Sequence, residues 1–233
     1  MQTIMISKVF KRNLINILSI IGCLQFVLLT GIAMMFFYKG GTYIDPSPLG
    51  YIFWQNYFSD LGRTVAHSGI PNTTSFLLFT IALSLWGITQ IPFYITFPIL
   101  FKNYPKFRKM SISGSIFGII SGISYVGIAF TPSDLTGSLH ELFVVIGFSF
   151  VFFSIILYSY VIFKNDNYPN FYAIILTISA FILSVYFLFL FFTPNSQTPE
   201  GLLIYAVGQK FMIYTLLICN IIQGYGALKQ NSS

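Results

Sequence analysis

The side chains that could do chemistry in this chain of 233 residues are few, because it holds only six acidic residues and two histidines. Most of them lie beside long apolar runs, as in the polar stretch Phe130–Leu142. Ionisable groups at membrane depth are costly to desolvate and by default mark a functional site. The sequence therefore predicts one polar pocket at the end of a helical bundle, built from Asp60, Arg63, Asp134, His140, Glu141, Gln209 and Lys210.

The charges of these residues indicate what such a pocket would bind. Arg63 and Lys210 are cations, so we expect them to contact an anion or a lipid headgroup. The charge of a histidine changes near neutral pH, which makes His140 the titrating group, with Glu141 or Asp134 orienting its ring. The pattern predicts non-catalytic binding of a lipid headgroup or a small ligand.

The same residues also have a purely structural interpretation. Asp60 and Asp134 each follow a serine, in the pattern of helix-capping pairs. Lys210 would then pair with Glu141 or Glu200, or extend its ammonium group toward the membrane surface. In that case the polar network would only hold the bundle together.

A metal-dependent membrane hydrolase acting on lipids is one alternative. A metal site needs at least three converging ligands, and His67, His140 and Asp134 could supply them. The chain has no HxxxH, HExxH or CxxC pattern. Neither a metal nor any other cofactor is therefore predicted.

A small-solute transporter is the other alternative. Transporters place their sites near the bilayer midplane, on interrupted helices. Gln209 and Lys210 interrupt the last apolar run, and Pro92 and Pro98 lie in the last turns of the second.

The composition identifies the class of protein that must position these residues. The chain is 55% hydrophobic and 8% charged, whereas soluble domains carry about 25% charged residues. Its net charge of +6 comes from basic residues that flank apolar runs, so nucleic acid is not an expected partner. Cys23 and Cys219 lie inside apolar runs, where free cysteines act as small buried hydrophobes.

The apolar runs define the architecture. Each is near the roughly 20 residues that cross a bilayer, and a chain without water to satisfy its backbone must be helical there. The sequence predicts an all-α, polytopic membrane protein with a single domain over residues 1–233. We expect six transmembrane helices at about 14–37, 76–100, 112–130, 142–163, 171–192 and 202–222.

The distribution of charge predicts the orientation. Five of the six acidic residues lie on the side opposite the main basic clusters. By the positive-inside rule both termini are cytoplasmic, the polar pocket is non-cytoplasmic, and we expect the protein in the cell membrane. Nine of the twelve basic residues define the cytoplasmic side: Lys8, Lys11, Arg12, Lys102, Lys106, Arg108, Lys109, Lys164 and Lys229.

Two local patterns predict how the bundle is covered and packed. The aromatic, amphipathic segment Tyr51–His67 in the first external loop predicts a short interfacial helix that covers the pocket as a lid. Gly114, Gly118 and Gly122 form a small-residue stripe that lets a neighbouring helix approach closely. The same face could join two copies in a homo-oligomer, and membrane lipids are the other expected partners.

Three segments together carry a family resemblance. They are Tyr57–Gly62 with Asn72, Phe130–Pro132 with His140, and Glu200 with Gly208–Lys210. In these segments the chain resembles the domain-of-unknown-function 998 family of six-helix membrane proteins, loosely related to the DRAM/Sfk-type group. The resemblance implies a six-helix bundle and no established activity.

Overall fold

The protein is an all-α bundle. The computed structural model describes residues 2–192 and 196–232, and within these ranges the only strand-like pairing is an isolated bridge between Val65 and Pro71. Six described helices are long and apolar enough to cross a membrane, which confirms the predicted multi-pass class. They are α1 Gln2–Ile32, α2 Thr73–Thr96, α3 Pro105–Phe130, α4 Ser133–Phe163, α5 Asn170–Phe192 and α6 Pro199–Ser232.

Three short turns of other helix types complete the secondary structure. α1 runs on into η1, a π-helical turn over Ala33–Phe37, in which the N–H of Tyr38 donates to the carbonyl of Ala33 at 3.0 Å. α2 narrows into η3, a 3-10 turn over Phe97–Phe101 that contains Pro98. The third turn, η2 over Phe58–Gly62, lies in the loop between α1 and α2.

Several helices are longer than the apolar runs that predicted them. α1 begins at Gln2, not near residue 14, and α6 continues to Ser232, not 222. α3 begins at Pro105, not near 112, and its first turns carry basic residues. Lys, Arg and Gln are good helix formers, and proline suits the first helical position. Hydropathy therefore marks the membrane-embedded part of each helix but not its ends.

The stretch Phe130–Leu142 is also more helical than a polar turn. α3 ends at Phe130, two residues follow, and α4 begins at Ser133. The backbone leaves helical geometry once, at Thr136, with φ −137° and ψ 48°. α4 thus starts with a short turn before its long membrane-crossing part.

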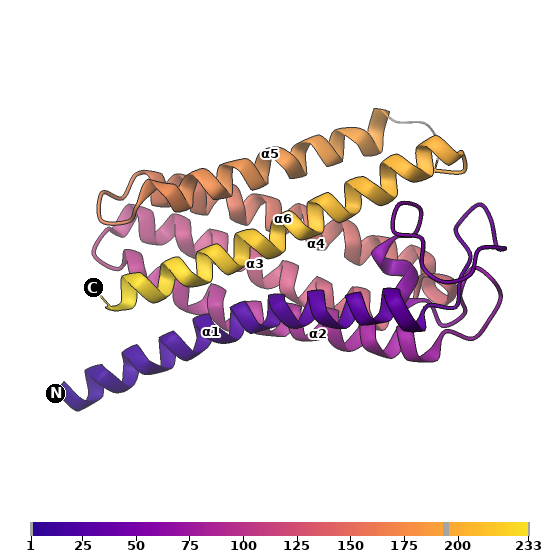
Figure 1. The fold of residues 1–233 in the computed structure, drawn as a ribbon. Coiled ribbons are helices and arrows are strands. Elements are labelled where there is room, and N and C mark those ends of the chain that lie inside the picture. Colours follow the sequence, from indigo (N-terminus) through magenta and orange to yellow (C-terminus); the bar gives the residue numbers. More distant parts are fainter. Residues whose placement is uncertain (1, 193–195, 233) are drawn as a thin grey trace.

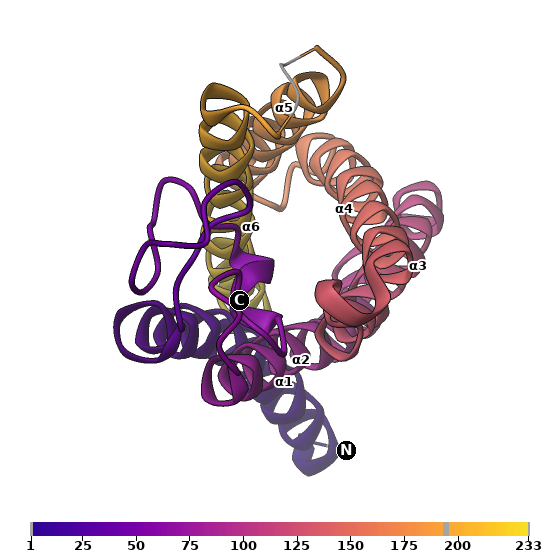
Figure 2. The same cartoon turned by 90° about the vertical axis from the view of Figure 1, so that its right-hand side faces the viewer.

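The six helices form a ring in chain order. Each helix packs against the next, and α1 packs against α6 to close the ring, as the end-on view in Figure 2 shows. The described N- and C-terminal ends both lie at one end of the bundle, and the long loop between α1 and α2 lies at the other (Figure 1). This is the arrangement that six successive crossings require.

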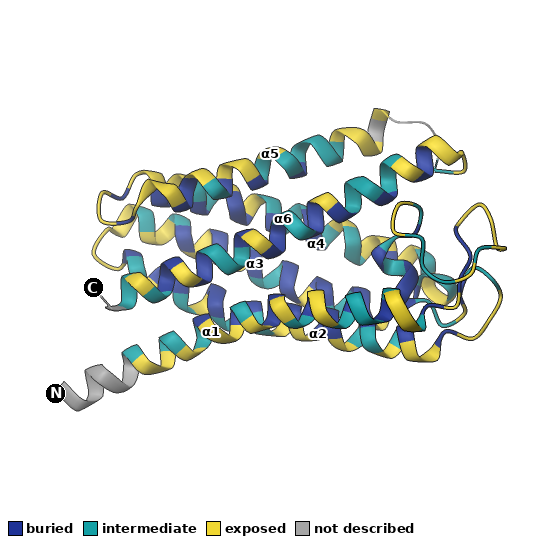
Figure 3. Cartoon of the chain, in the orientation of Figure 1, coloured by how far each residue is buried: buried dark blue, intermediate teal, exposed yellow. Residues whose placement is uncertain are grey.

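Aromatic rings fill the centre of the ring of helices. Phe26, Trp86, Tyr125 and Phe148, from α1 to α4 in turn, contact one another with centroid distances of 5.1, 4.7 and 5.7 Å. Buried residues face inward along every helix and exposed ones face outward (Figure 3). The exposed outer surface is largely apolar, as contact with lipid requires.

The glycine stripe on α3 packs within the chain. A Cβ atom built on Gly118 would lie 2.4 Å from the Tyr94 ring of α2, and one on Gly122 would lie 2.9 Å from the Gly87 carbonyl. Gly114 faces Tyr158 of α4 in the same way. The expected close approach of a neighbouring helix is present. A second copy could pair through this face only by displacing α2 and α4.

Residues 38–72, which we call the cap, lie at the end of the ring away from the termini, beside α1, α2 and α6 (Figure 2). The cap turns sharply at Gly40 and Gly41, whose φ angles are 95° and 79°. Side chains would be strained there, and a Cβ atom on Gly41 would also lie 2.4 Å from the nitrogen of Ser68. At its centre, η2 inserts the buried ring of Phe58 between Phe26 and Tyr214.

Candidate functional site

The cap is organised around Asn56, a fully buried residue. Its side-chain nitrogen donates to the carbonyl of Gly41 and to Asp60 Oδ2, both at 2.9 Å. Its side-chain oxygen accepts from the N–H of Ile52 at 2.8 Å. One amide thus ties together three parts of the cap that are far apart in the sequence.

Lys210 of α6 contacts Asn56 from the side of the helical bundle. Its ammonium group donates to the carbonyl of Asn56 and, at 3.3 Å, to the carbonyl of Ala206. It also lies 5.1 to 5.9 Å from the ring centroids of Tyr51, Phe53 and Phe58. Ring faces and carbonyl oxygens both stabilise a desolvated cation. Lys210 therefore fastens the cap to α6.

Tyr51 completes this attachment. Its hydroxyl donates to the carbonyls of Asn56 and Tyr57 at 3.1 and 3.0 Å. Burial, and in second place the charge of Asp60, raises the pKa of this hydroxyl well above its usual range. Tyr51 therefore remains a hydrogen-bond donor at any physiological pH.

Gln209, the neighbour of Lys210, holds η2. Its side-chain oxygen accepts from the N–H of Phe58 at 2.8 Å. That N–H lies at the start of η2, where a short helix has no partner of its own for it. α6 thus contacts the cap at two successive residues.

Asp60 and His67 lie in contact inside the cap. Asp60 Oδ1 lies 3.1 Å from His67 Nε2, while Oδ2 accepts from the N–H of Tyr57 at 2.8 Å. Asp60 is 4% exposed, and both carboxylate oxygens are occupied within the cap. Asp60 is the third residue of η2, so its bond to the N–H of Tyr57 is that of a capping box, and Asp60 is not the N-cap residue.

Asp134, at the start of α4, holds the cap from the other side. Its oxygens accept from the N–H of Thr64 at 3.1 Å, the hydroxyl of Thr64 at 2.6 Å and the N–H of Val65 at 3.0 Å. Hydrogen bonds to a charged acceptor are stronger than neutral ones. Asp134 and Lys210 fasten the cap at two separate points.

Two predicted residues take no part in this network. Arg63 donates from Nε to the carbonyl of Val65 at 3.1 Å, in its own loop. Glu141 is exposed and does not pair with Lys210, which has no carboxylate within ion-pair distance among the described residues. On a helix, Glu141 faces away from its buried neighbour His140. The expected pairing of Lys210 with an acid is therefore wrong.

His140 makes no side-chain hydrogen bond to the cap in the described structure. Its side chain is 6% exposed, and Nδ1 lies 2.7 Å from the carbonyl of Thr131, in the link between α3 and α4. A backbone carbonyl orients the ring, in place of the acid that we expected.

The residues that the hydrolase alternative would have needed as metal ligands are not brought together. His67 pairs with Asp60, His140 bonds to Thr131, and Asp134 bonds to the cap backbone. Across residues 2–192 and 196–232, no three His, Cys, Asp or Glu side chains form a group that could hold a metal ion.

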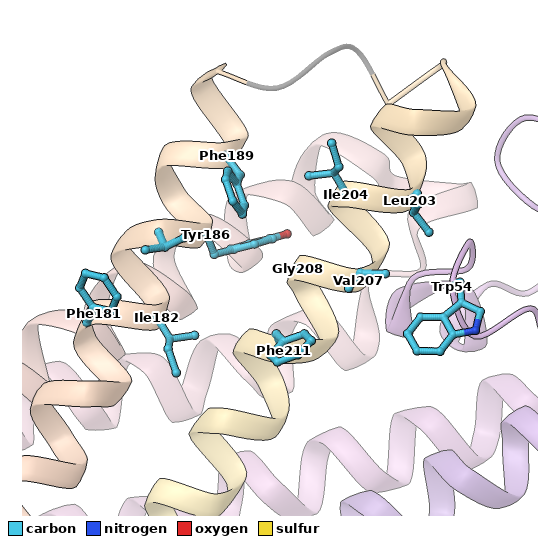
Figure 4. Close-up of a pocket in the computed structure, with 11 residues that line it drawn as sticks. Trp54, Phe181, Ile182, Tyr186, Phe189, Leu203, Ile204, Val207, Gly208 and Phe211 are labelled. Atoms are coloured by element: carbon cyan, nitrogen blue, oxygen red, sulfur yellow. The ribbon is translucent and has the colours of Figure 1, made fainter.

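A large hollow lies elsewhere, between α5 and α6 beside the cap. This groove has a volume of about 710 Å³ and an almost wholly apolar lining. Figure 4 shows the Tyr186 ring extending from α5 toward Gly208 of α6, with Trp54 of the cap at one side. The lining residues are Trp54, Phe181, Ile182, Val185, Tyr186, Phe189, Leu203, Ile204, Val207, Gly208 and Phe211.

Sequence reasoning missed the groove and the cap residues Asn56 and Thr64. Asn56 had a weak signal, since it is a lone amide inside an aromatic stretch. The groove had none, because Phe and Ile on a membrane helix equally predict contact with bulk lipid.

Comparisons with family models, with curated proteins and with solved structures find no match to this chain. The resemblance to the domain-of-unknown-function 998 family therefore remains a hypothesis. The geometry of the cap and the groove is what bears on function.

Proposed function

We propose that the protein binds an acyl chain of a membrane lipid in the groove between α5 and α6. The observation that carries this proposal is the groove itself, an apolar hollow of about 710 Å³. Its volume lies within the roughly 300–1,000 Å³ that is usual for ligand pockets.

The position of the groove determines its occupant. Its walls belong to the membrane-crossing segments Asn170–Leu190 and Pro199–Asn231. At this depth the surrounding solvent is hydrocarbon, and the lining offers an incoming molecule almost no polar partner. An acyl chain is the abundant molecule with matching chemistry.

The source of affinity follows from the same setting. Lipid tails are as apolar as the groove, so transfer from the bilayer gains little hydrophobic free energy. Binding must come from van der Waals contact with the rings of Tyr186, Phe189 and Phe211. We therefore expect selection among chains by shape rather than high affinity.

The cap supports this function by positioning Trp54. Trp54 is 58% exposed, and its ring packs edge-on against Phe53 at 5.0 Å between centroids. Phe53 in turn lies over the ammonium of Lys210. The polar residues of the predicted pocket thus hold the wall of the groove, and we no longer assign Arg63 and Lys210 to a headgroup.

The alternatives have less geometric support. The ligands of the proposed metal-dependent hydrolase lie in three separate networks. A transporter needs a central path, and aromatic rings occupy the bundle axis.

We further infer the orientation and the membrane. The end with both termini carries most of the basic residues, so we place it in the cytoplasm. The cap then lies on the non-cytoplasmic face, with η2 near the interface, and we assign the protein to the cell membrane.

The test uses the chain's two tryptophans. Phospholipids with brominated acyl chains, added to the protein in detergent micelles, should quench Trp54 in a saturable way. Trp86 is buried, and a Trp54→Phe variant measures its background. Val207→Phe fills the groove and should abolish saturable quenching.

A matched control separates this groove from lipid contact in general. A second apolar groove of about 420 Å³ includes Ile123 in its wall, so Ile123→Phe adds an equal ring at an unrelated place. Quenching of Trp54 that rises without saturation, or that is unchanged in Val207→Phe, would contradict the proposal.

A further inference from the structure

A small cavity of about 30 Å³ lies at the centre of the bundle, directly beneath the cap. Its walls come from η2 and five of the six long helices and are mostly apolar. Five lining residues carry polar side-chain atoms: Ser59 of η2, Trp86 of α2, Tyr125 of α3, His140 of α4 and Gln209 of α6. The cavity is separate from the groove between α5 and α6 and shares no lining residue with it.

The hydrogen bond of His140 fixes the state of its ring. Nδ1 lies 2.7 Å from the carbonyl of Thr131, and a carbonyl only accepts, so Nδ1 must carry the proton. In the neutral ring Nε2 is then an acceptor. Nε2 has no hydrogen-bond partner among the described residues.

Gln209 presents the complementary group. Its side-chain oxygen is identified by the bond that it accepts from the N–H of Phe58, which assigns the NH₂ group to the other position. Both N–H groups of this NH₂ lack a partner in the described structure. The cavity is therefore lined by a residue with an unpaired acceptor, on α4, and by a residue with unpaired donors, on α6.

Tyr125 adds a further polar group. Its side chain lines the cavity, and its hydroxyl makes no hydrogen bond of normal geometry, although Ser121 lies near it. A buried polar group without a partner costs about 1–3 kcal/mol. Several such groups around one cavity indicate an occupant that both donates and accepts.

We propose that this cavity is a binding site for buried water, which donates to His140 Nε2 and accepts from the Gln209 NH₂ group. A water needs about 10–15 Å³ of such space and two to four polar partners, and the cavity supplies both. The bound water completes a hydrogen-bonded chain from Thr131 through His140 and Gln209 to Phe58. This chain links α4, α6 and the cap across the bundle axis.

This site goes beyond the proposed lipid function and does not depend on it. The protein has only two histidines, so ¹⁵N-histidine labelling in lipid bilayers resolves their ring nitrogens by solid-state NMR, and a His67→Gln variant assigns them. We expect His140 to be protonated at Nδ1, with Nε2 unprotonated, hydrogen-bonded and receiving magnetisation from water protons.

Val144→Ile tests the occupant without removing a polar group. Val144 lines the cavity, and one added methyl group displaces the water. The transfer of magnetisation from water protons to Nε2 should then vanish. The chemical shift of Nε2 should move to that of an imidazole nitrogen without a hydrogen bond. The Nδ1 signal should not move. Val145→Ile, at the exposed neighbouring position, should match the wild type.

Three results would overturn the proposal. They are a proton on Nε2 in the neutral ring, no transfer from water to Nε2 in the wild type, and equal transfer in the wild type and Val144→Ile. If Val144→Ile does not fold, Gln209→Met removes the NH₂ donors, and the proposal then requires a weaker water signal at Nε2.

Discussion

The contact between α2 and α3 and the contact between α5 and α6 are built from opposite kinds of side chain. At the first, a Cβ atom on Gly87 would lie 2.5 Å from the carbonyl oxygen of Gly122, so the two backbones touch. At the second, the Tyr186 ring extends from α5 toward Gly208 of α6, and a groove remains beside it.

This difference separates two uses of helix packing in a membrane. Small residues let helices associate through close van der Waals contact, and α2 and α3 pack in this way. Large rings cannot interdigitate as closely, so the other side of the ring leaves an open groove. The proposed acyl-chain site therefore lies at the more open of the two contacts.

Gly87→Ala should break the close contact and have the largest effect. The atom in the way is a backbone oxygen, which cannot rotate aside, so the helices must separate. We expect a loss of about 2–3 kcal/mol in the free energy of unfolding, within the usual range for overpacking. Thermal unfolding in detergent micelles measures it.

Gly31→Ala is the matched control, because no atom lies within 4 Å of a Cβ atom built there. Alanine gains up to about 1 kcal/mol in helix propensity over glycine, so this variant should be slightly more stable. Equal behaviour of the two variants would contradict the close contact.

Ser115→Ala tests the polar part of the packing around α3. The Ser115 hydroxyl donates to the carbonyl of Tyr94 at 2.5 Å, which leaves Tyr158 to donate to Ser115 at 2.7 Å. Its loss leaves buried groups without a partner, at a cost of about 1–3 kcal/mol. Unfolding of the single variants and of a double variant with Tyr158→Phe isolates the interaction between the two hydroxyls.

Ser113→Ala, two residues away, is the control. The Ser113 side chain is exposed and bonds only within its own helix, so we expect a change within about 0.5 kcal/mol. If the Ser115 and Ser113 variants are equally stable, the hydroxyl cluster does not contribute to the packing.

Asp134→Ala should loosen the cap, whose Trp54 forms one wall of the groove. The contacts of α2 with α3 and of α5 with α6 should stay intact. The carboxylate accepts from two backbone N–H groups and one hydroxyl, but it is partly exposed, so we expect a local loss of about 1–2 kcal/mol. Hydrogen exchange at the amides of Thr64 and Val65 should become faster. The exposed Glu141→Ala serves as control, and equal acceleration in both variants would argue against the attachment.

The sequence was sufficient for the class of fold because composition and run length determine it directly. Each helix needs about 20 apolar residues to cross a membrane, and six such runs are visible. The ends of the helices were harder to predict from the sequence. Basic and amide residues end the apolar run without ending the helix, as in Pro105–Phe130.

The candidate site was predicted only in part, because charge indicates importance but not a partner. Asp60, Asp134, Gln209 and Lys210 do gather around one loop. Their partners are mainly backbone groups, which every residue carries and no sequence pattern reveals. The pocket expected between these side chains is therefore filled by the cap itself.

Gly208→Ala repeats the glycine-to-alanine substitution at the contact between α5 and α6, and it should have the smallest effect on stability. A Cβ atom on Gly208 would lie 2.9 Å from the Tyr186 ring. Unlike a carbonyl oxygen, this ring ends a flexible side chain beside an open groove, so it can tilt away. The cost should be offset by the gain of up to about 1 kcal/mol in helix propensity, and unfolding should be nearly unchanged. Because the tilted ring takes up groove volume, saturable quenching of Trp54 should weaken in this variant and stay unchanged in Gly31→Ala. A loss of stability as large as that of Gly87→Ala would mean that α5 and α6 are packed as tightly as α2 and α3, and that the groove cannot admit a chain.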